Sequence, residues 1–597
     1  MKGKGLAKLL VFIAIVCSLN SCGETSLYQR DETLYVGGAQ WGSPCTFNPL
    51  AWWSAFPILS GGNNNIMYEH LLKYNILTGE LEPLLATLHE RTNEHISVIM
   101  NPAARWSDGE PLTAEDVVFT FGLSQENAGL PTSYVWDYIS DIKVETIEEE
   151  GDSFELVKFV MTDAKRLSPL AVLSMMQSVW IVPKHVIQAR LEELDGDISA
   201  LQGERMSDDP VVSGPYTLDN FTNERIVLRR RDDYWGIDAL YDGRKPNPKY
   251  IIHPILKGNS HFALALQQGT MDVTSTYIPR IWIRERHGVR TWYPEEPYYV
   301  AGSIPTIVLN VTKEPLSDVN IRRAMAHAIN YADIAELAVS GYSEDLQPGL
   351  ILPFGNEGRY YCAEDAQKYG RLFDPDKARQ ILKDAGYSSV IDSRGRLSYM
   401  LNADGERVPT VEIMSPAGWS DWEAIVRLVV RDMRAVGIDV RERFIDASTY
   451  WTSQPNGDFD MVMHTPAADL TPAHPLARFE AVMSSRDWAP IGTRMNENYG
   501  RYNNPNSEDY NSAVDSLIQL IPILTDEEEV KEAYRALNRH YMNDLPALTL
   551  VYRPEQYYQF SISNWENFPS NENPYAPPQT PTVGAARDML WELQSIN

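Results

Sequence analysis

Short apolar runs alternate with amphipathic stretches along the chain from Leu34 onward. Runs with β character recur at Ile96–Met100, Ile226–Leu228, Thr306–Leu309, Val411–Met414, Met461–Met463 and Leu548–Tyr552. Between these runs, the apolar residues follow the spacing of an amphipathic helix. Because the two patterns alternate, and no internal repeat or low-complexity linker interrupts them, the sequence predicts an α/β architecture.

The clearest helix signal lies in the second half of the chain. One apolar stripe is formed there by Ile425, Leu428, Val429, Met433 and Val436. Ser420 and Glu423 precede the stripe at the spacing of a capping box, which predicts that the helix begins near Asp421.

Two further helices can be placed from their end signals. One is expected over Ile321–Val339, because Asp318 is a suitable residue for its N-terminal end. The other is expected over Pro375–Ala385, with Gly386 positioned to adopt the left-handed conformation that often ends a helix.

The first 21 residues have the pattern of an export signal. Met1–Lys8 is basic and Leu9–Val16 is apolar but too short to span a bilayer, which needs about 20 apolar residues. The segment ends in Ser21-Cys22, which resembles the cleavage box of bacterial lipoproteins, where the new N-terminal cysteine is acylated. We therefore predict a lipid anchor on Cys22; the alternative is an ordinary signal peptide with a chance cysteine.

Length and charge narrow the class of protein. A chain of 597 residues is longer than one hydrophobic core normally serves, so two or three domains are expected. The formal net charge is −29, and the acidic residues are spread along the chain. Such a surface repels nucleic acid and anionic lipid, so polyanionic ligands are poor candidates and no nucleic-acid partner is expected.

Cysteines contribute little to the predicted fold. Cys17 would leave with the signal and Cys22 would carry lipid, so only Cys45 and Cys362 remain. These two could pair in an oxidising compartment. We favour two free thiols.

Several segments, taken in chain order, match one known family. They are Arg105–Thr120 (RWSDGEPLTAEDVVFT), Ser213–Tyr216, Arg231–Gly236, Leu266–Val273, Asp318–Ile329 and Phe373–Tyr387. Together they resemble the extracellular solute-binding proteins of family 5, the peptide- and oligosaccharide-binding components of ABC importers. The segments are rich in turn and capping residues, such as Ser107-Asp108-Gly109 and Thr113, so we interpret them as structural and assign none of them to ligand contact.

The resemblance implies the two-lobed periplasmic-binding-protein fold of the large family-5 type, with an inserted subdomain in lobe I. After a signal peptide at 1–21, lobe I would comprise a main subdomain at 22–64, 206–303 and 549–597. Its inserted subdomain would take 65–205, and lobe II would take 304–548. Thr306–Asn310 and Leu548–Tyr552 would cross between the lobes, and the lobes would close on the ligand by hinge bending.

The resemblance also implies partners and location. The chain would be a monomeric lipoprotein in the periplasm or at the outer face of the cytoplasmic membrane, and would deliver its ligand to ABC permease subunits. The only Gly-Lys pair is Gly3-Lys4, so there is no Walker A motif and the ATPase must be a separate protein. No cofactor is expected.

Two ligand classes remain open. Peptide-binding members of the family hold the ligand amino terminus with an aspartate after a lobe II strand. In the corresponding stretch His464–Pro475 the only acidic residue is Asp469, and its setting departs from the family pattern. Gly418–Trp422, Phe47–Trp53 and Trp565–Pro578 instead resemble the cello-oligosaccharide-binding branch. We therefore predict a β-linked oligosaccharide, with an oligopeptide or dipeptide as the alternative.

An indole ring supplies a flat apolar plate for the C–H face of a pyranose, and neighbouring polar side chains can bind its hydroxyls. The predicted ligand-binding residues for a sugar are Trp419, Trp422, Asp421, Trp52, Trp53, Asn48 and Asn64, and Asp469 is the candidate for a peptide. The aromatic rings could instead pack between the lobes, and the asparagines could belong to surface turns.

Catalysis is not predicted. A glycoside hydrolase would need two carboxyl groups roughly 5–9.5 Å apart, and 81 acidic residues make such a pair uninformative in sequence. His89-Glu90 lacks the second histidine of a zincin, and no Gly-x-Ser-x-Gly motif occurs. His464 and His474 are interpreted as hydrogen-bonding or packing residues, so no catalytic residue and no metal site is assigned. A scaffold with a vestigial cleft is the third class of function to consider.

Overall fold

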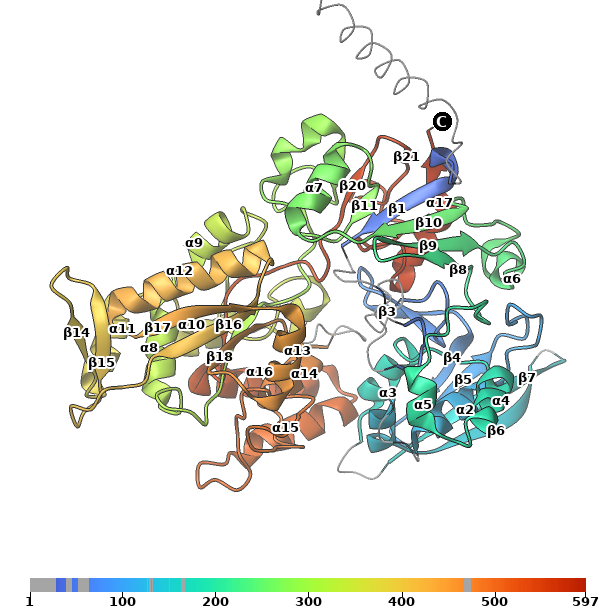
Figure 1. Cartoon of the computed structure of the whole chain (residues 1–597). Coiled ribbons are helices and arrows are strands. Elements are labelled where there is room, and N and C mark those ends of the chain that lie inside the picture. Colours follow the sequence, from blue (N-terminus) through green and yellow to red (C-terminus); the bar gives the residue numbers. More distant parts are fainter. Residues whose placement is uncertain are drawn as a thin grey trace, which may run out of the picture.

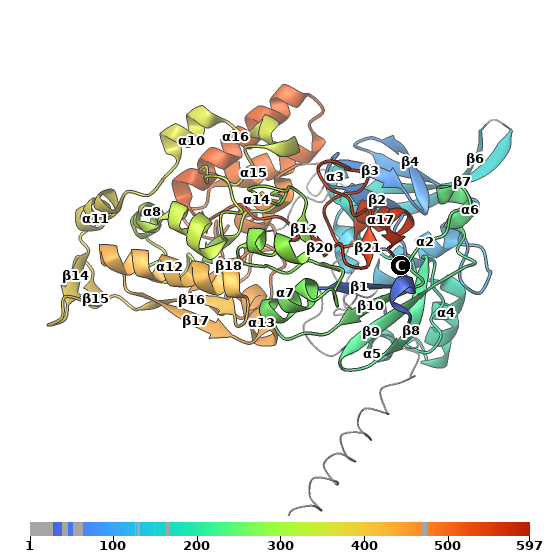
Figure 2. The same ribbon diagram turned by 90° about the horizontal axis from the view of Figure 1, so that it is seen from above.

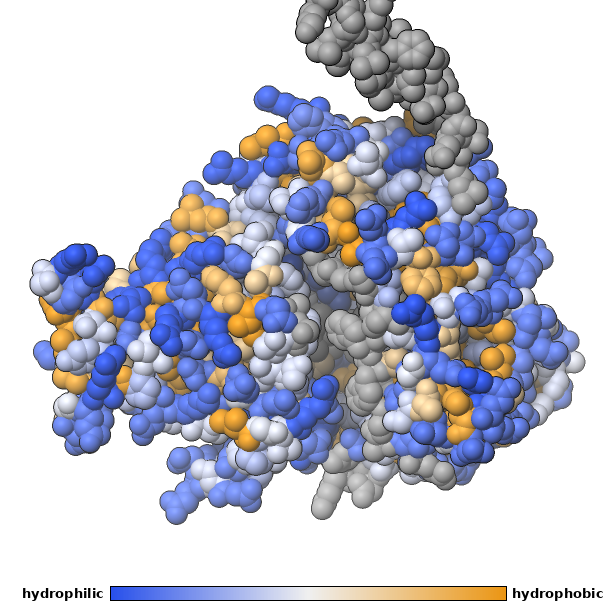
Figure 3. All heavy atoms as spheres, viewed as in Figure 1, coloured by the Kyte–Doolittle hydropathy of each residue, from blue (hydrophilic) through white to orange (hydrophobic). Residues whose placement is uncertain are grey.

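The structure is a computed structural model that describes residues 28–38, 44, 46–51, 64–125, 127, 130, 132–149, 151–162, 167–466 and 474–596. Two bodies lie side by side (Figure 1). Seen from above, the hairpins β14–β15 (388–401) and β6–β7 (139–161) extend at opposite ends of the molecule (Figure 2). Figure 3 shows a hollow between the two bodies. We call the body with the N- and C-terminal strands lobe I and the other body lobe II.

Lobe I is built around a seven-stranded sheet with the order β12-β20-β11-β1-β10-β9-β8. Its strands are β1 (Thr33–Gly37), β8 (Tyr216–Phe221), β9 (Arg225–Arg230), β10 (Tyr250–Pro254), β11 (Val273–Thr274), β12 (Val289–Thr291) and β20 (Gln559–Ser561). Strand β1 runs parallel to β10 and β11, whereas the other pairs are antiparallel. The sheet thus joins the two ends of the described chain to its middle. Helices α6 (Gly236–Tyr241), α7 (Asn259–Gln267) and α17 (Met589–Glu592) accompany it.

A second sheet in lobe I is antiparallel, with the order β4-β5-β7-β6. It comprises β4 (Ala86–Arg91), β5 (His95–Met100), β6 (Ile139–Glu149) and β7 (Asp152–Met161), with helices α2 (Ala114–Gln125), α3 (Pro169–Met176), α4 (Lys184–Glu193) and α5 (Ile198–Gly203). One cluster of buried apolar residues runs through both sheets of lobe I. The segment predicted as an inserted subdomain therefore shares its core with the main sheet. The exact residue boundaries of the predicted domains stay a prediction.

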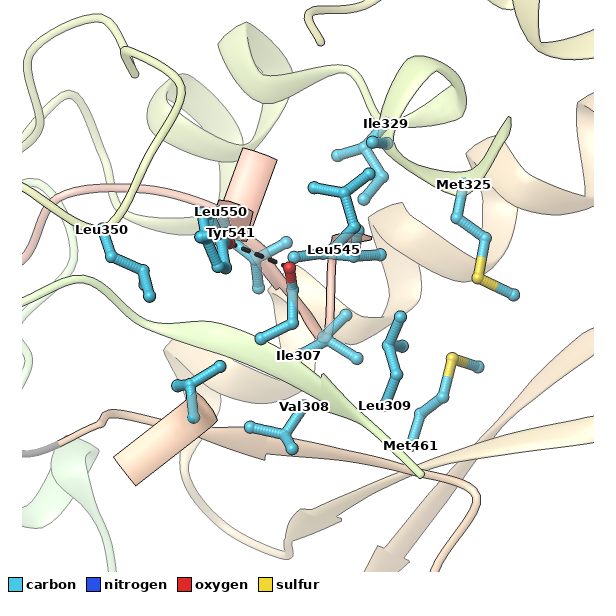
Figure 4. Packing of buried hydrophobic residues seen from close by; sticks show 14 of the residues in the cluster. Ile307, Val308, Leu309, Met325, Ile329, Leu350, Met461, Tyr541, Leu545 and Leu550 are labelled. Carbon is cyan, nitrogen blue, oxygen red and sulfur yellow. Dashed lines mark hydrogen bonds between the residues drawn. The ribbon is translucent and has the colours of Figure 1, made fainter. Parts of the chain in front are cut away.

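Lobe II contains a five-stranded sheet with the order β17-β16-β18-β13-β19. Its strands are β13 (Thr306–Leu309), β16 (Val411–Pro416), β17 (Val440–Ile445), β18 (Met461–His464) and β19 (Ala547–Thr549). Its larger helices are α8 (Val319–Ala328), α11 (Pro375–Asp384), α12 (Ser420–Val436), α13 (Ala447–Asn456), α14 (Leu476–Met483), α15 (Ser512–Leu520) and α16 (Glu527–Asp544). Figure 4 shows the apolar residues of β13 packed in the core, beside the hydrogen bond that Tyr541 donates to the Ala547 carbonyl at 2.9 Å.

Five of the six predicted strand runs lie within strands, whereas only the first two residues of the run Leu548–Tyr552 do, because β19 ends at Thr549. The helix over Pro375–Asp384 is confirmed as well. Asp374 caps its N-terminus by accepting a hydrogen bond from the Lys377 N–H, and Gly386 has a φ of +85°.

The single helix predicted over Ile321–Val339 is wrong. Helix α8 ends at Ala328, and Ile329 is extended. Asn330 then begins a new helix by accepting a hydrogen bond from the Asp333 N–H at 3.2 Å, and it donates its own N–H to Asp432 at 3.0 Å. A polar side chain that caps a second helix therefore overrides the continuous apolar pattern.

Helix α12 begins close to the predicted residue but is capped differently. The N-cap is Trp419, and the Glu423 carboxylate accepts a hydrogen bond from the Gly418 N–H at 2.8 Å, so the predicted Ser420–Glu423 capping box does not form. The Ser420 hydroxyl instead accepts a hydrogen bond at 3.2 Å from Asn259, at the start of α7 in lobe I. The N-terminus of α12 therefore meets the other lobe.

The matched segment Arg105–Thr120 has a structural role, as predicted. Asp116 in the first turn of α2 accepts hydrogen bonds from the Trp106 indole at 3.3 Å and from the Thr113 N–H at 3.0 Å. It also accepts a hydrogen bond from the Lys184 N–H at 2.9 Å. One buried carboxylate thus ties the turn, α2 and the start of α4 together.

A buried ion pair explains the Tyr-Trp dipeptide of the matched segment Arg231–Gly236. Glu69 and Arg587 are both fully buried and their charged atoms lie 2.7 Å apart. Tyr234 and Trp235 donate hydrogen bonds to the same Glu69 carboxylate at 2.6 and 3.0 Å. These contacts join segments of lobe I that are more than five hundred residues apart in sequence.

Candidate ligand-binding cleft

Two adjacent chain segments connect the lobes. Strands β13 and β19 pair at the edge of the lobe II sheet, and Ser303 and Arg553 form a further β-bridge toward lobe I. The second segment then enters the lobe I sheet as β20. This is the paired crossing that the family resemblance implies, and hinge bending of the lobes about it stays a prediction.

The lobes also touch away from the connecting segments. Leu170 in α3 of lobe I is buried in the apolar core cluster of lobe II. The Arg486 guanidinium lies over the Tyr138 ring, 5.4 Å from its centroid, and Asn93 donates a hydrogen bond to the Ile523 carbonyl at 3.2 Å. The lobes therefore contact each other directly as well as through the connecting segments.

One edge of the lobe II sheet has the geometry of a binding site. Strands β16, β17 and β18 are parallel, so their carboxyl ends lie at the same edge, where α12 and α13 also begin. Ligands of open α/β sheets bind at this kind of edge. Contacts from Asn259 and Arg553 show that the edge faces the other lobe and the connecting segment.

Six buried side-chain polar atoms without a hydrogen-bond partner among the described residues lie at this edge or on the connecting segment. They belong to Ser415 (Oγ), Asp421 (Oδ2), Trp422 (Nε1), Thr465 (Oγ1), Arg553 (Nε) and Tyr557 (Oη). Leaving such an atom unsatisfied costs about 1–3 kcal/mol, and the great majority in folded proteins have a partner. A group of them, containing both donors and acceptors, indicates a site for a polar ligand.

Arg553 links the members of this group. Its Nε lies 3.5 Å from the Asp421 carboxylate, which is an ion pair without hydrogen-bond geometry, and its guanidinium lies 4.7 Å from the centroid of the Tyr557 ring. Asp421 is in the first turn of α12, whereas Arg553 is on a connecting segment. A ligand group that binds here would contact lobe II and the joint together.

Four aromatic rings form a cluster beside these atoms. The rings of Trp419 and Trp422 are 4.8 Å apart, and Trp451 lies 6.4 Å from Trp419 and 4.9 Å from Tyr450. Trp419 is half-buried and Trp451 is 41% exposed, so both can offer a face to a ligand. Trp422 is only 3% exposed and belongs to the lobe II core. The prediction that Trp422 stacks on a ligand is therefore wrong, although its indole N–H has no hydrogen-bond partner among the described residues.

His464 lies next to this edge in a neutral state. It is at the end of β18, and its Nδ1 is 2.8 Å from the Gln454 amide nitrogen. Burial lowers the pKa of His464 to about 4, and burial together with Arg359 and Arg91 lowers the pKa of His474 to about 3. Among the described residues, no group of three or more His, Cys, Asp or Glu side chains is arranged to hold a metal ion.

The two predicted asparagines are buried in lobe I. Asn48 donates hydrogen bonds to the carbonyls of Leu201 and Glu204 at 2.7 and 3.4 Å, and its amide oxygen accepts one from the Leu50 N–H. Its side chain thus holds a loop against α5, which corrects the prediction of a ligand contact. Asn64 is 4% exposed, and its backbone carbonyl accepts a hydrogen bond from Trp180 at 2.6 Å.

The other predicted residues lie outside the described part of the chain. These are the signal segment with Cys22, together with Cys45, Trp52, Trp53 and Asp469. Cys362 is half-buried and its thiol is free. The sequence reasoning missed Arg553, Tyr557 and Trp451. The Trp451 signal was available, since Tyr450-Trp451 follows a strand and a capping Asp446, as Trp419 follows another strand.

Comparisons with known proteins agree with this geometry. The family model "Bacterial extracellular solute-binding proteins, family 5 Middle" matches residues 80–487. The peptidoglycan-binding protein YepA of Agrobacterium fabrum is 25% identical over 89% of this chain and 85% of its own. The dipeptide-binding protein of Escherichia coli is 26% identical over 65% of this chain and 68% of its own. These relatives are binding proteins, which confirms the prediction that the chain is not an enzyme.

Solved structures show the same two-lobed fold. A periplasmic oligopeptide-binding protein of Thermotoga maritima, solved with bound mannohexaose, matches with a TM-score of 0.81 and 28% identity, covering 96% of this chain and 100% of its own. An oligopeptide-binding protein of Bacillus subtilis with a bound nonapeptide matches with a TM-score of 0.69 and 19% identity, covering 96% of this chain and 100% of its own. The predicted fold class is confirmed. In the described part of the chain, no helix has both the length and the apolar character required to cross a membrane.

Proposed function

The chain belongs to the bacterial extracellular solute-binding proteins of family 5, and from this premise we propose that its cleft captures a β-linked oligosaccharide for an ABC importer. The ligand proposal rests on the group of buried polar atoms beside Trp419, at the edge of the lobe II sheet, that have no hydrogen-bond partner in the described part of the chain. A separate ATPase and permease subunits complete the proposed importer, and the binding protein acts as a monomer.

A sugar suits the chemistry of this edge. Trp419 and Trp451 offer partly exposed indole faces, and a pyranose has an apolar C–H face that stacks on such a plate. Hydroxyl groups both donate and accept, so they match a site that contains the Trp422 N–H and the oxygens of Asp421 and Ser415. The mannohexaose bound by the Thermotoga maritima protein supports the same ligand class.

An oligopeptide is the second candidate. It is favoured by relatives whose names state peptide or dipeptide binding, and by the nonapeptide in the Bacillus subtilis structure. In that case Asp469 is the candidate for binding the ligand amino terminus. The pattern around Asp469 departs from that of peptide-binding members, so we rank this candidate second.

A thermal-shift screen of the mature protein against cello-, manno- and xylo-oligosaccharides and a mixed peptide library tests the ligand class. A ligand at 100 times its dissociation constant adds about 2.7 kcal/mol to the free energy of unfolding, which raises the melting temperature. We expect a shift with oligosaccharides. A shift with peptides alone would overturn the sugar proposal, and no shift with either class would indicate a vestigial cleft.

Replacing Trp419 by alanine is expected to weaken oligosaccharide binding by about 1–3 kcal/mol, because a stacked aromatic side chain is a typical binding hot spot. The free energy of unfolding should change little, since Trp419 is only half-buried. Calorimetric titration measures the affinity. Trp282→Ala is the control, because Trp282 is 38% exposed and packs on Tyr298 and Tyr342 rather than on Trp419. Equal affinities of the two variants would remove Trp419 from the site.

We further propose that Cys22 becomes the acylated N-terminus of the exported chain. The basic and apolar pattern before it and the Ser21-Cys22 box support this proposal. The anchor would hold the protein at the outer face of the cytoplasmic membrane. We expect cells that express Cys22→Ala to yield a protein without labelled fatty acid, and the variant protein to appear in the soluble fraction. Continued incorporation of label into the variant would contradict the anchor.

A further inference from the structure

A second pocket lies at the joint between the lobes, apart from the cleft edge described above. Its volume is about 170 Å³. Lobe I contributes Tyr74 and Tyr558, lobe II contributes Phe354 and Glu357, and the connecting segments contribute Gly302 and Glu555. None of the residues with the six unpartnered polar atoms lines it.

The Glu555 carboxylate in this pocket makes no hydrogen bond and no ion pair with any residue that the structure describes. The cation that acts on it is Arg478, whose guanidinium is already committed to Glu357 at 2.8 and 3.0 Å and to the Leu350 carbonyl. Burial raises the pKa of Glu555 to about 7, so the carboxyl is poised between its two protonation states near neutral pH. Glu555 is partly buried, and a carboxylate that loses part of its water without gaining a counter-ion among the described residues is destabilised; a cation brought next to it relieves that cost.

The walls of the pocket determine which cation fits. The aromatic residues of the lining are Tyr74, Tyr299, Phe354 and Tyr558, and Leu77, Leu352 and Pro578 add apolar surface. Glu357 also lines the pocket but is paired with Arg478, so Glu555 is the carboxylate left for a ligand, and aromatic rings beside a carboxylate favour organic ammonium groups. A divalent metal ion needs more oxygen ligands, and no group of three candidate ligands occurs among the described residues.

We propose that this pocket binds an ammonium group carried on a short apolar stem, with Glu555 as its counter-ion. The site is separate from the cleft and holds whether the cleft takes a sugar or a peptide. Two sources share this chemistry: a free small amine, and a lysine side chain or amino terminus of a peptide held between the lobes.

The position of the pocket makes its occupancy sensitive to lobe closure. Because its walls come from both lobes and from both connecting segments, the closed arrangement assembles them. A ligand that binds only this arrangement stabilises it, and the coupling is reciprocal. Cargo in the cleft is therefore expected to tighten ammonium binding, and the ammonium ligand to tighten cargo binding by the same factor.

Calorimetric titration of the mature protein with n-butylammonium, near pH 8, tests the proposal. We expect binding to the wild type, at least a roughly tenfold loss of affinity in Glu555→Gln, and no change in the control Glu295→Gln, which is an exposed carboxyl in the same lobe. The neutral analogue n-butanol should not bind. Absence of butylammonium binding to the wild type, or equal binding by Glu555→Gln, would overturn the proposal.

The pH dependence gives a second readout. Only the ionised carboxylate attracts the ammonium group, so affinity should rise as the pH increases through about 7, the pKa of Glu555. Glu555→Gln should show no such rise. An affinity that is independent of pH in the wild type would contradict Glu555 as the counter-ion.

The melting temperature of Glu555→Gln without ligand shows whether this variant is folded. Between the ordinary glutamate pKa and about 7, Glu555 is protonated in the folded protein but ionised in the unfolded chain. The free energy of unfolding of the wild type therefore falls as the pH rises through this window. Glu555→Gln lacks this loss and should melt at the wild-type temperature or above it near pH 8. A lower melting temperature at that pH would contradict an uncompensated Glu555 carboxylate.

Two comparisons distinguish a free amine from a peptide amine as the ligand, and the pocket from the cleft as the binding site. The first comparison uses a peptide that binds in the cleft and the same peptide with its amines acetylated. If acetylation weakens binding to the wild type but not to Glu555→Gln, the ammonium group belongs to the cargo. If the two peptides bind equally well, the pocket takes a free amine. Trp419→Ala should weaken cargo binding and leave butylammonium binding unchanged. The cleft proposal and the pocket proposal can therefore fail independently.

Discussion

Replacing Arg587 by methionine is expected to lower the free energy of unfolding by about 3–5 kcal/mol, because it leaves the buried Glu69 carboxylate without its cation. Both side chains are fully buried, so water cannot replace the lost partner. Burial already raises the pKa of Glu69, and Arg587 opposes that shift. Without Arg587 the folded state should hold a proton on Glu69 more tightly, so the loss of stability should grow as the pH rises. Denaturant unfolding at several pH values measures it.

Arg244→Met is the matched control for this experiment. Arg244 also pairs with a glutamate in lobe I, Glu592, but their side chains are 53% and 38% exposed. An exposed pair contributes less than about 1 kcal/mol, so this variant should be close to the wild type. Glu69→Gln combined with Arg587→Met should recover part of the loss, because no unpaired charge remains buried. If Arg587→Met were as mild as Arg244→Met, the Glu69–Arg587 pair would not be a charged element of the core.

Replacing Trp422 by alanine is expected to lower the free energy of unfolding by about 3–5 kcal/mol, the usual cost of removing a large buried aromatic side chain. Trp422 is 3% exposed and packs in the lobe II core, with Trp419 and Tyr450 as aromatic neighbours. Trp419→Ala, which empties a half-buried position, serves as the comparison and should cost less stability. Equal losses in thermal unfolding would contradict the different burial of the two rings.

Trp422→Phe separates the two contributions of this residue. Phenylalanine keeps much of the apolar volume but lacks the indole N–H, which is buried without a partner in the described structure. Its stability should therefore exceed that of Trp422→Ala. If the N–H donates to the ligand, oligosaccharide affinity should fall by about 1 kcal/mol in Trp422→Phe. Wild-type affinity in this variant would show that the indole N–H does not contact the ligand.

The local features of the fold could be predicted because neighbouring residues encode them. The strand over Thr306–Leu309 and the helix over Pro375–Asp384 follow from apolar periodicity and from end residues that act on their own backbone. The prediction failed at Ile329-Asn330, where the capping of a new helix and a hydrogen bond to Asp432 decide the break. Periodicity alone does not register a contact with a residue a hundred positions away.

The candidate site also has some features that the sequence predicts and others that only the structure shows. Sequence alone determined the family, the α/β class, the crossing segments and the location of Trp419 and Asp421 at a helix start after a strand. Only the tertiary structure decided that Trp422 is core, that the Asn48 amide donates to the carbonyls of Leu201 and Glu204, and that Arg553 pairs with Asp421. It alone places Glu555 in a pocket at the joint, where its carboxylate makes no ion pair with a described residue. Whether a polar group is satisfied depends on atoms brought together from distant parts of the chain, and that is a property of packing rather than of local pattern.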